Sequence, residues 1–307
     1  MNDNSLKDRA AGTIVGALIG DALALGPHWY YDLKQLRERF GPWINGYTDP
    51  EPERYHEGLK AGNLSQTGLI TLELLRSVVA NGRYDEADFT RRLDEKLLQH
   101  MDGSPYDGPG GYTNQSIREL YQARVRDKKP WGQTGDYSDT TEGAERAVVI
   151  AARYALSPTE GAQLIARNIR LTQIDPFVVA LSASYCVIVS ALIRGEPFNR
   201  HLSGKLYGLV EKGILPFTHA VLTENKEKYA HDPTAPSAAR PYPDGLLFPS
   251  HIWQAAKDPQ VTIEPAWKVS LVYGMPCSIL CMLPAAYYLA ARFQEDFEQA
   301  VLHAVNG

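Results

Sequence analysis

The sequence has few cysteines, no excess of positive charge and no long uninterrupted hydrophobic run. Its 307 residues include 3 cysteines, and 31 lysines and arginines stand against 36 aspartates and glutamates, for a formal net charge of −5 at pH 7. An odd number of cysteines without a Cys-x-x-Cys pair argues against a disulfide framework and is typical of reduced thiols. An acidic chain also lacks the basic face that nucleic-acid binding requires. We therefore expect a cytoplasmic protein that binds neither nucleic acid nor a membrane.

The sequence also lacks a β-strand pattern, a repeat of fixed period and a linker-like segment. Apolar residues instead recur at three- and four-residue spacing between loops rich in glycine and proline, which is typical of helices. The segment 177–193 is apolar nearly all round and predicts a central buried helix. Together these features predict a single all-α domain over residues 1–307. Helices are predicted at residues 9–25, 33–40, 65–81, 84–97, 116–126, 141–155, 158–169, 177–193, 201–212, 217–229, 251–256, 279–291 and 293–304.

The stretch from residue 12 to residue 29 has the most unusual pattern in the chain. Three glycines recur there at every fourth position: Gly12, Gly16 and Gly20. On a helix that Asp8 would cap, this spacing predicts one glycine face that another backbone can approach closely. Asp21 then interrupts the apolar run, and such a carboxylate must be hydrogen-bonded, paired or metal-bound. After a Gly-Pro break, His28 and Trp29 follow, and the indole could stack on a flat ring. The pattern indicates one wall of a site; a packed core helix with a capped end is the alternative.

Polar residues begin or directly precede several predicted helices. Ser65, Gln66 and Thr67 start one helix, where free backbone amides and the helix dipole favour an anion such as phosphate. Asp139 and Asp175 precede two later helices. All of these positions also suit residues that only cap a helix, so a structural role remains open for each.

Three further features carry weaker signals. The glycine-rich loop at residues 108–114 could approach a phosphate through Thr113, although it lacks the lysine of a phosphate-binding loop. Cys277 has no identifiable base to activate it, and we interpret it as structural. Glu142 and Glu145 follow a helix start, and we interpret them as solvated charges in a capped first turn.

Five segments, in order along the chain, resemble motifs of the ADP-ribosylglycohydrolase family. Residues 12–26 match its Gly-x-x-x-Gly-x-x-x-Gly-Asp-Ala-Leu-Gly pattern, and the helix that begins at Ser65 corresponds in position to its Thr-Asp-Asp-Thr motif. The other segments are 139–152, which contains Arg146, then 171–176, which contains Gln173, and 297–307, which resembles the lead-in to a final acidic motif. The resemblance covers most of the chain and implies an orthogonal helix bundle whose cleft holds two Mg²⁺ ions and ADP-ribose.

The chain departs from the family pattern at both acidic motifs. Ser65-Gln66-Thr67-Gly68 stands where the family has Thr-Asp-Asp-Thr, which keeps oxygen atoms but removes the negative charge that Mg²⁺ usually requires. The final acidic motif would begin where the sequence stops, at Gly307, and we expect the domain to lack it. Mg²⁺ is therefore expected from the resemblance alone, and its ligands are unknown.

The segment from Gly20 to Asp32, together with the lost acid pair, resembles the J1-type crystallin branch of the family. Two functions follow. One is hydrolysis of an N- or O-glycosidic bond to ADP-ribose or a related nucleotide; the alternative is a catalytically degenerate, J1-crystallin-like protein with a nucleotide-binding or structural role. In either case we expect an ADP-ribose-like small molecule as the partner, and a monomer or a homodimer. Candidate catalytic residues are Asp21, Asp139 and Asp175, and candidate ligand contacts are His28, Trp29, Ser65, Gln66, Thr67, Thr113, Arg146 and Gln173.

Overall fold

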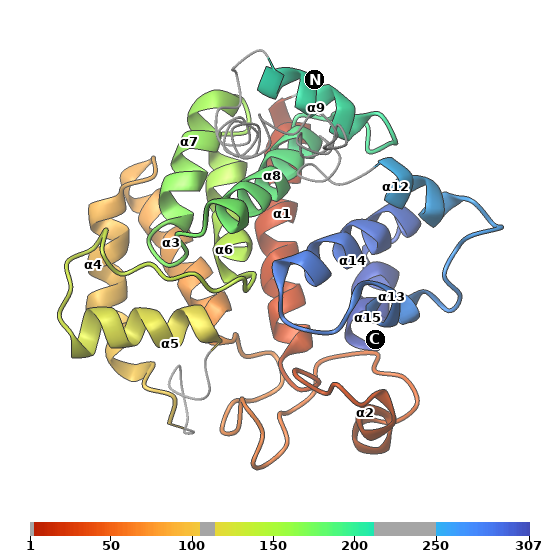
Figure 1. Ribbon diagram of the computed structural model, residues 1–307, viewed down its shortest axis with the longest axis horizontal. Helices are drawn as coiled ribbons and strands as arrows, with labels where there is room; N and C mark the ends of the chain where they lie inside the picture. The colour runs from red at the N-terminus through yellow and green to blue at the C-terminus, as the bar shows by residue number, and fades with distance from the viewer. Residues whose placement is uncertain (1–2, 105–113, 212–249) are drawn as a thin grey trace, which may run out of the picture.

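The computed structural model describes residues 3–104, 114–211 and 250–307, where helices are joined by loops (Figure 1). The main helices are α1 (Asp3–Ala24), α2 (Leu33–Phe40), α3 (Gln66–Asn81), α4 (Glu86–Lys96), α5 (Gln115–Tyr121), α6 (Glu142–Arg153), α7 (Pro158–Ile169), α8 (Pro176–Ile193), α9 (Leu202–Glu211), α12 (Ser250–Lys257), α13 (Val269–Tyr273), α14 (Ile279–Arg292) and α15 (Phe297–Val305). Over these ranges there is no strand, only an isolated parallel bridge between Asp136 and Gln173. The all-α prediction is confirmed.

Side-chain caps explain where several helices begin. Ser65 accepts a hydrogen bond from the amide of Gly68 at the start of α3, and Asp175 accepts from the first amides of α8. The predicted cap at Asp8 is wrong, because α1 begins at Asp3 and Asp8 lies within it. The polar residues before Arg9 continue the helix, which the spacing of apolar residues could not indicate.

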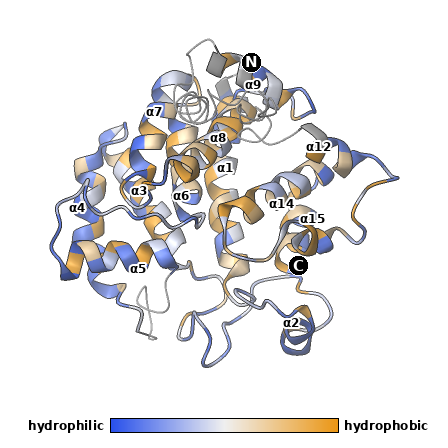
Figure 2. Cartoon of the chain, in the orientation of Figure 1, coloured by the Kyte–Doolittle hydropathy of each residue, from blue (hydrophilic) through white to orange (hydrophobic). Residues whose placement is uncertain are grey.

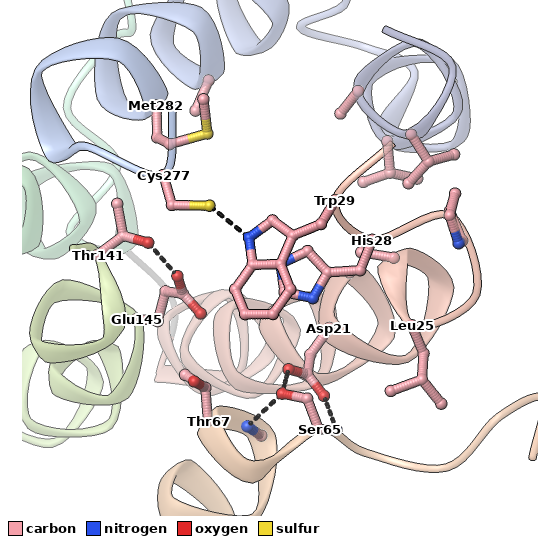
Figure 3. Close-up of a pocket in the computed structure, with 18 of the residues that line it drawn as sticks. Asp21, Leu25, His28, Trp29, Ser65, Thr67, Thr141, Glu145, Cys277 and Met282 are labelled. Atoms are coloured by element: carbon pink, nitrogen blue, oxygen red, sulfur yellow. Dashed lines mark hydrogen bonds between the residues drawn. The ribbon is translucent and has the colours of Figure 1, made fainter. Parts of the chain in front are cut away.

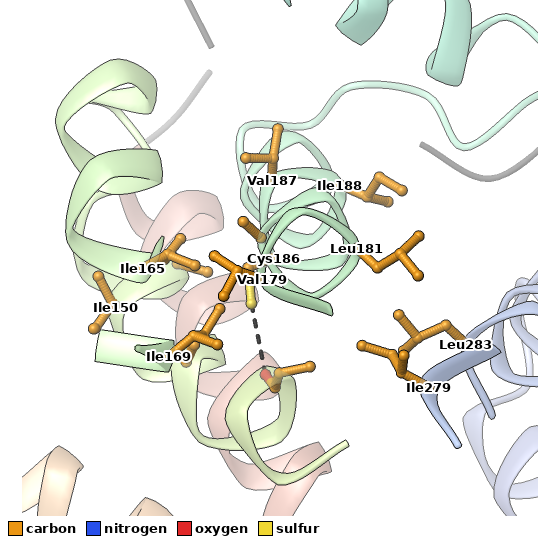
Figure 4. Close-up of a cluster of buried hydrophobic side chains, with 14 of the residues drawn as sticks. Ile150, Ile165, Ile169, Val179, Leu181, Cys186, Val187, Ile188, Ile279 and Leu283 are labelled. Atoms are coloured by element: carbon orange, nitrogen blue, oxygen red, sulfur yellow. Dashed lines mark hydrogen bonds between the residues drawn. The ribbon is translucent and has the colours of Figure 1, made fainter. Parts of the chain in front are cut away.

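Helix α8 forms the centre of the core. It is apolar on nearly all sides and lies between α6 and α7 on one side and α14 on the other (Figures 2 and 4). Its Cys186 thiol donates to the carbonyl of Ala144 in α6. By length and composition α8 is long enough to cross a membrane, yet 72% of it is buried within the fold. The predicted central helix is confirmed.

The glycine face of α1 does not bring another backbone close, contrary to the prediction. A Cβ atom on Gly12 or Gly20 would meet nothing within 4 Å, and one on Gly16 would lie 3.4 Å from the Phe297 ring of α15. The helix packs on α3, α6, α8 and α15 (Figure 1). The missing side chains leave space rather than a tight contact, and Gly16 and Gly20 line a cavity.

Other differences concern helix ends and short helices. The last helix begins at Phe297 rather than at Phe293, because Asp296 caps it by accepting a hydrogen bond from the amide of Gln299. The short helix α13 lies in a segment where no helix was predicted. The helix predicted at residues 217–229 lies outside the described residues.

Arg146 of α6 is a fully buried brace between helices. Its guanidinium donates to the Asn168 side chain and carbonyl at the end of α7, at 2.9 and 2.8 Å, and to the Thr172 hydroxyl at 2.9 Å. It also pairs with Glu142 at 3.3 Å, and both side chains are only 1% exposed. Burial lowers the pKa of Arg146, while the Glu142 carboxylate opposes that change. Arg146 therefore ties α6 to the C-terminal end of α7 and to Thr172 just beyond it.

We expect Arg146→Ala to lower the free energy of unfolding by about 3–5 kcal/mol, because Glu142 would remain buried without its counter-charge. Urea denaturation measures this. Arg153→Ala is the matched control on the same helix, where an exposed guanidinium binds the carbonyl of Gly82 and its loss should cost about 1 kcal/mol. Equal losses for the two variants would contradict the role of Arg146.

Candidate functional site

A cavity of 540 Å³ lies among α1, the turn that follows it, and the starts of α3, α6 and α14 (Figure 3). Its floor is the glycine face of α1, and Asp21 and Glu145 supply its carboxyl groups. Trp29, Tyr31 and Tyr185 form aromatic walls, and Met275, Cys277 and Met282 place sulfur atoms on the side of α14. The volume lies in the range of small-molecule sites.

Asp21 is seated on the N-terminus of α3. Its Oδ2 accepts from the Ser65 amide at 2.8 Å and its Oδ1 accepts from the Ser65 hydroxyl. A Cβ atom on Gly68 would lie 2.2 Å from Asp21 Oδ2, so only glycine permits this approach. Burial raises the pKa of Asp21, and the hydrogen bonds from Ser65 and Gly68 partly offset that rise. A carboxylate of the chain itself thus occupies the position where we expected an anionic ligand.

Trp29 stands at the cavity in a strained backbone conformation. Its φ angle is 62°, in the left-handed region that a bulky residue rarely adopts. Several contacts hold it there: the indole Nε1 donates to Cys277 Sγ at 2.6 Å, Arg54 donates to its carbonyl at 2.7 Å, and its ring meets Tyr55 edge-on at 4.0 Å. Such over-determined strain is concentrated at functional positions.

Two histidines stack behind Trp29. The His28 ring lies 4.3 Å from the Trp29 ring and 4.9 Å from the His56 ring, and His28 Nδ1 is 2.6 Å from His56 Nε2. Burial lowers the pKa of His28 to about 3, with smaller contributions from His56 and Arg54, and lowers the pKa of His56 to about 4. Both rings are therefore neutral at physiological pH.

Glu145 of α6 faces the cavity opposite this cluster, and the Thr141 hydroxyl donates to its Oε1 (Figure 3). The side chain is exposed, and it lines the cavity. Burial raises the pKa of Glu145 to about 7, and the nearby charges of Asp21 and Glu142 add to the rise. A carboxyl group with this pKa can both give and take a proton near neutrality.

The structure brings together part of the predicted site. Asp21, His28, Trp29, Ser65 and Thr67 all line the cavity. Gln66 is buried and does not line it. Thr113 lies outside the described residues.

Four predicted site residues lie apart from the cavity lining and have structural contacts. Asp139 accepts a hydrogen bond from the Ser278 hydroxyl at 2.5 Å, and its carbonyl accepts from the first amide of α14. Asp175 caps α8, and Arg146 braces α6 and α7 as described above. Gln173 is fully buried and donates to the carbonyls of Ser138 and Thr140.

Sequence reasoning missed three residues that line the cavity: Glu145, His56 and Cys277. Glu145 was interpreted as a solvated charge, although it lies three residues before Val148, a buried apolar residue that also lines the cavity, and so shares that face of α6. His56 lies in the long loop 41–64, where no period signals its direction. Cys277 reaches the cavity through a contact across 248 residues of chain, for which the sequence holds no signal.

Over the described residues, these observations define an all-α protein with a cavity that carries two carboxyl groups and an aromatic wall. A family model described as ADP-ribosylglycohydrolase matches residues 2–307, so the chain belongs to the ADP-ribosylglycohydrolase family. A comparison with curated proteins found no match. A solved structure titled "ADP-ribosylglycohydrolase-related protein complex" superposes with a TM-score of 0.52 and 17% identity, covering 99% of this chain and 82% of that one. At this identity the likeness establishes the fold alone.

The cavity residues do not fit the pair of Mg²⁺ ions that the family resemblance implies. Ser65, Gln66 and Thr67 carry no charge, and both oxygens of Asp21 already accept hydrogen bonds from Ser65. The Glu145 Oε1 atom likewise already accepts a hydrogen bond from the Thr141 hydroxyl. Within the described ranges no three His, Cys, Asp or Glu side chains gather as a metal site. Mg²⁺ needs near-octahedral oxygen ligands with at least one free carboxylate, which this arrangement does not supply.

We expect Gly68→Ala to destabilise the protein by about 1–3 kcal/mol, because its methyl group would displace the Asp21 carboxylate from α3. The matched control is Gly12→Ala in α1, which meets nothing within 4 Å and should stabilise the helix by about 0.5–1 kcal/mol. Urea denaturation of both variants is the measurement. A Gly68→Ala protein as stable as the wild type would show that Asp21 is not seated on α3.

Proposed function

We propose that this protein hydrolyses an N- or O-glycosidic bond to the ribose of an ADP-ribose-type nucleotide, with Glu145 as the proton donor. The observation that carries the proposal is the position of Glu145 on the cavity together with a pKa raised to about 7. Membership of the ADP-ribosylglycohydrolase family supports a hydrolase that acts on ADP-ribose linkages. Perturbed carboxyl groups in a cavity are typical of catalytic acids and bases.

Cleavage of a glycosidic bond needs an acid at the leaving atom and a second group at the attacking water. Glu145 gives its proton to the leaving oxygen or nitrogen as the bond to the anomeric carbon breaks. Water then forms the new bond to that carbon, and the Asp21 carboxylate takes the proton that the water loses. The raised pKa of Asp21 makes it a better base than an ordinary aspartate.

The remaining cavity residues bind the substrate and exclude water. Trp29 offers a flat indole face, which suits a base or a nicotinamide-like ring. The hydrogen bonds that Ser65 donates to Asp21 fix the direction of that carboxylate. No step of this reaction passes through a metal ion, since the cavity residues do not fit one.

The alternative is a J1-crystallin-like protein that binds a nucleotide in this cavity without cleaving it. The observation that favours it is the engagement of both Asp21 oxygens by Ser65, at the position where the family pattern has acidic residues. In that case the carboxylate stabilises the start of α3 and has no part in catalysis.

Glu145→Gln should lower the rate of ADP-ribose release by about 100-fold or more, because the amide has no proton to give while it still accepts from Thr141. Release from N- and O-linked ADP-ribosylated peptides is measured by chromatography. Asp139→Asn is the control, a carboxyl group outside the cavity, and should leave the rate unchanged. If the wild type binds ADP-ribose in calorimetry but releases none from either linkage, the binding alternative is correct.

The rate should fall as the pH rises above about 7, because the proton-donating form of Glu145 is present below its pKa.

The stability of the protein should also fall as the pH rises. A carboxyl group whose pKa is raised on folding favours the native state at low pH, and that contribution is lost as the pH rises from about 4.5 through about 7. A pH–rate profile and urea denaturation across this range measure the two effects. Glu145→Gln should remove this part of the pH dependence of stability.

A further inference from the structure

We propose that His56 is a positioning residue that holds His28 in one tautomer, with the Nε2–H of His28 as a fixed hydrogen-bond donor to a ligand oxygen in the cavity. The proposal deepens the proposed function, on which its ligand rests, because both concern the same cavity. His28 lines the cavity, and its Nδ1 is committed to His56 Nε2 at 2.6 Å, which leaves Nε2 for the ligand.

The two rings are locked against one another and against Trp29. The planes of His28 and His56 lie within 15° of each other, and those of His28 and Trp29 within 28°. His56 is only 4% exposed, so its ring has little room to turn. The pair therefore behaves as one rigid unit in the wall of the cavity.

The unpaired nitrogen of His56 decides which ring donates the shared proton. His56 Nδ1 is buried and has no hydrogen-bond partner among the described residues. If His28 donated through Nδ1, then His56 Nδ1 would carry a buried N–H without an acceptor. If His56 donates through Nε2, its Nδ1 is a bare lone pair, and an orphaned buried acceptor is tolerated more often than an orphaned buried N–H. The second arrangement places the His28 proton on Nε2.

Burial keeps both rings neutral, with a smaller contribution from Arg54 at His28, so the pair holds one proton between the two facing nitrogens. Arg54 lies over the Tyr30 ring at 4.1 Å and donates to the Trp29 carbonyl, which adds a positive charge beside the pair. Two cationic rings would place N–H groups against one another and break the 2.6 Å hydrogen bond.

A neutral donor beside two carboxyl groups suits a sugar hydroxyl. Such a hydroxyl can accept from His28 Nε2–H and donate its own proton to Asp21 or Glu145, which an organic cation could not do. The inferred ligand group at this wall is therefore a ribosyl hydroxyl or ring oxygen.

The experiment is two-bond ¹H–¹⁵N NMR on the full ¹⁵N-labelled chain, which distinguishes the two tautomers of a neutral histidine. His28→Asn assigns the signal among the 8 histidines. The expected wild-type result is the Nε2–H tautomer of His28 at every pH between about 5.5 and 8. His56→Gln, whose amide can still donate to His28 Nδ1, should keep that tautomer, whereas His56→Leu should give a mixture of tautomers.

Calorimetry measures how the His56 substitutions change the affinity for ADP-ribose. His56→Leu should weaken binding about 10-fold, and His56→Gln should restore most of the affinity. An Nδ1–H tautomer of His28 in the wild type, or an unchanged tautomer in His56→Leu, overturns the proposal. Equal ADP-ribose affinity of the wild type and His56→Leu overturns the ligand contact. Because the NMR result needs no turnover, a failure of ADP-ribose release in the presence of the expected tautomer would count against the proposed hydrolysis alone.

Discussion

The contact between the Asp21 carboxylate and the N-terminus of α3 constrains everything else around the cavity. It joins the end of α1 to a helix that begins 45 residues later, and it requires glycine at position 68 because a Cβ atom there would lie 2.2 Å from the carboxylate. The negative charge meets the free amides and positive dipole end of α3, which suits both partners. Once these helices are joined, the turn that carries His28 and Trp29 has a fixed position.

The same contact sets the chemistry of the cavity. A carboxylate that accepts two hydrogen bonds from Ser65 is oriented, and its charge helps to raise the pKa of Glu145 to about 7. The neutral residues at positions 65–67 remove the charges that two Mg²⁺ ions would need. In their place the cavity has one oriented carboxyl group, one carboxyl group that exchanges protons near neutrality, and a neutral histidine pair. This set of groups supports acid–base chemistry.

The core and the cavity use similar sequence patterns for different purposes. On α8 most of the apolar surface is covered by neighbouring helices, chiefly α6 and α7. On α1 the glycine face is left partly uncovered, and the space forms the floor of the cavity. Arg146 is a second case in which a sequence pattern permits two roles. It was expected to contact a ligand, but it is buried against Glu142 and donates to the Asn168 carbonyl at the end of α7.

The sequence by itself determined most of the helices and the caps at Ser65 and Asp175, because periodicity and capping depend on residues only a few positions apart. It also pointed to Asp21, His28 and Trp29, since a carboxylate and a Gly-Pro break interrupt one apolar helix. Only the tertiary structure decided that Asp139, Asp175, Arg146 and Gln173 serve contacts away from the cavity, while Glu145, His56 and Cys277 line it. The reason is physical: a side chain's burial and pKa depend on partners that are distant in the chain, such as Cys277 for Trp29.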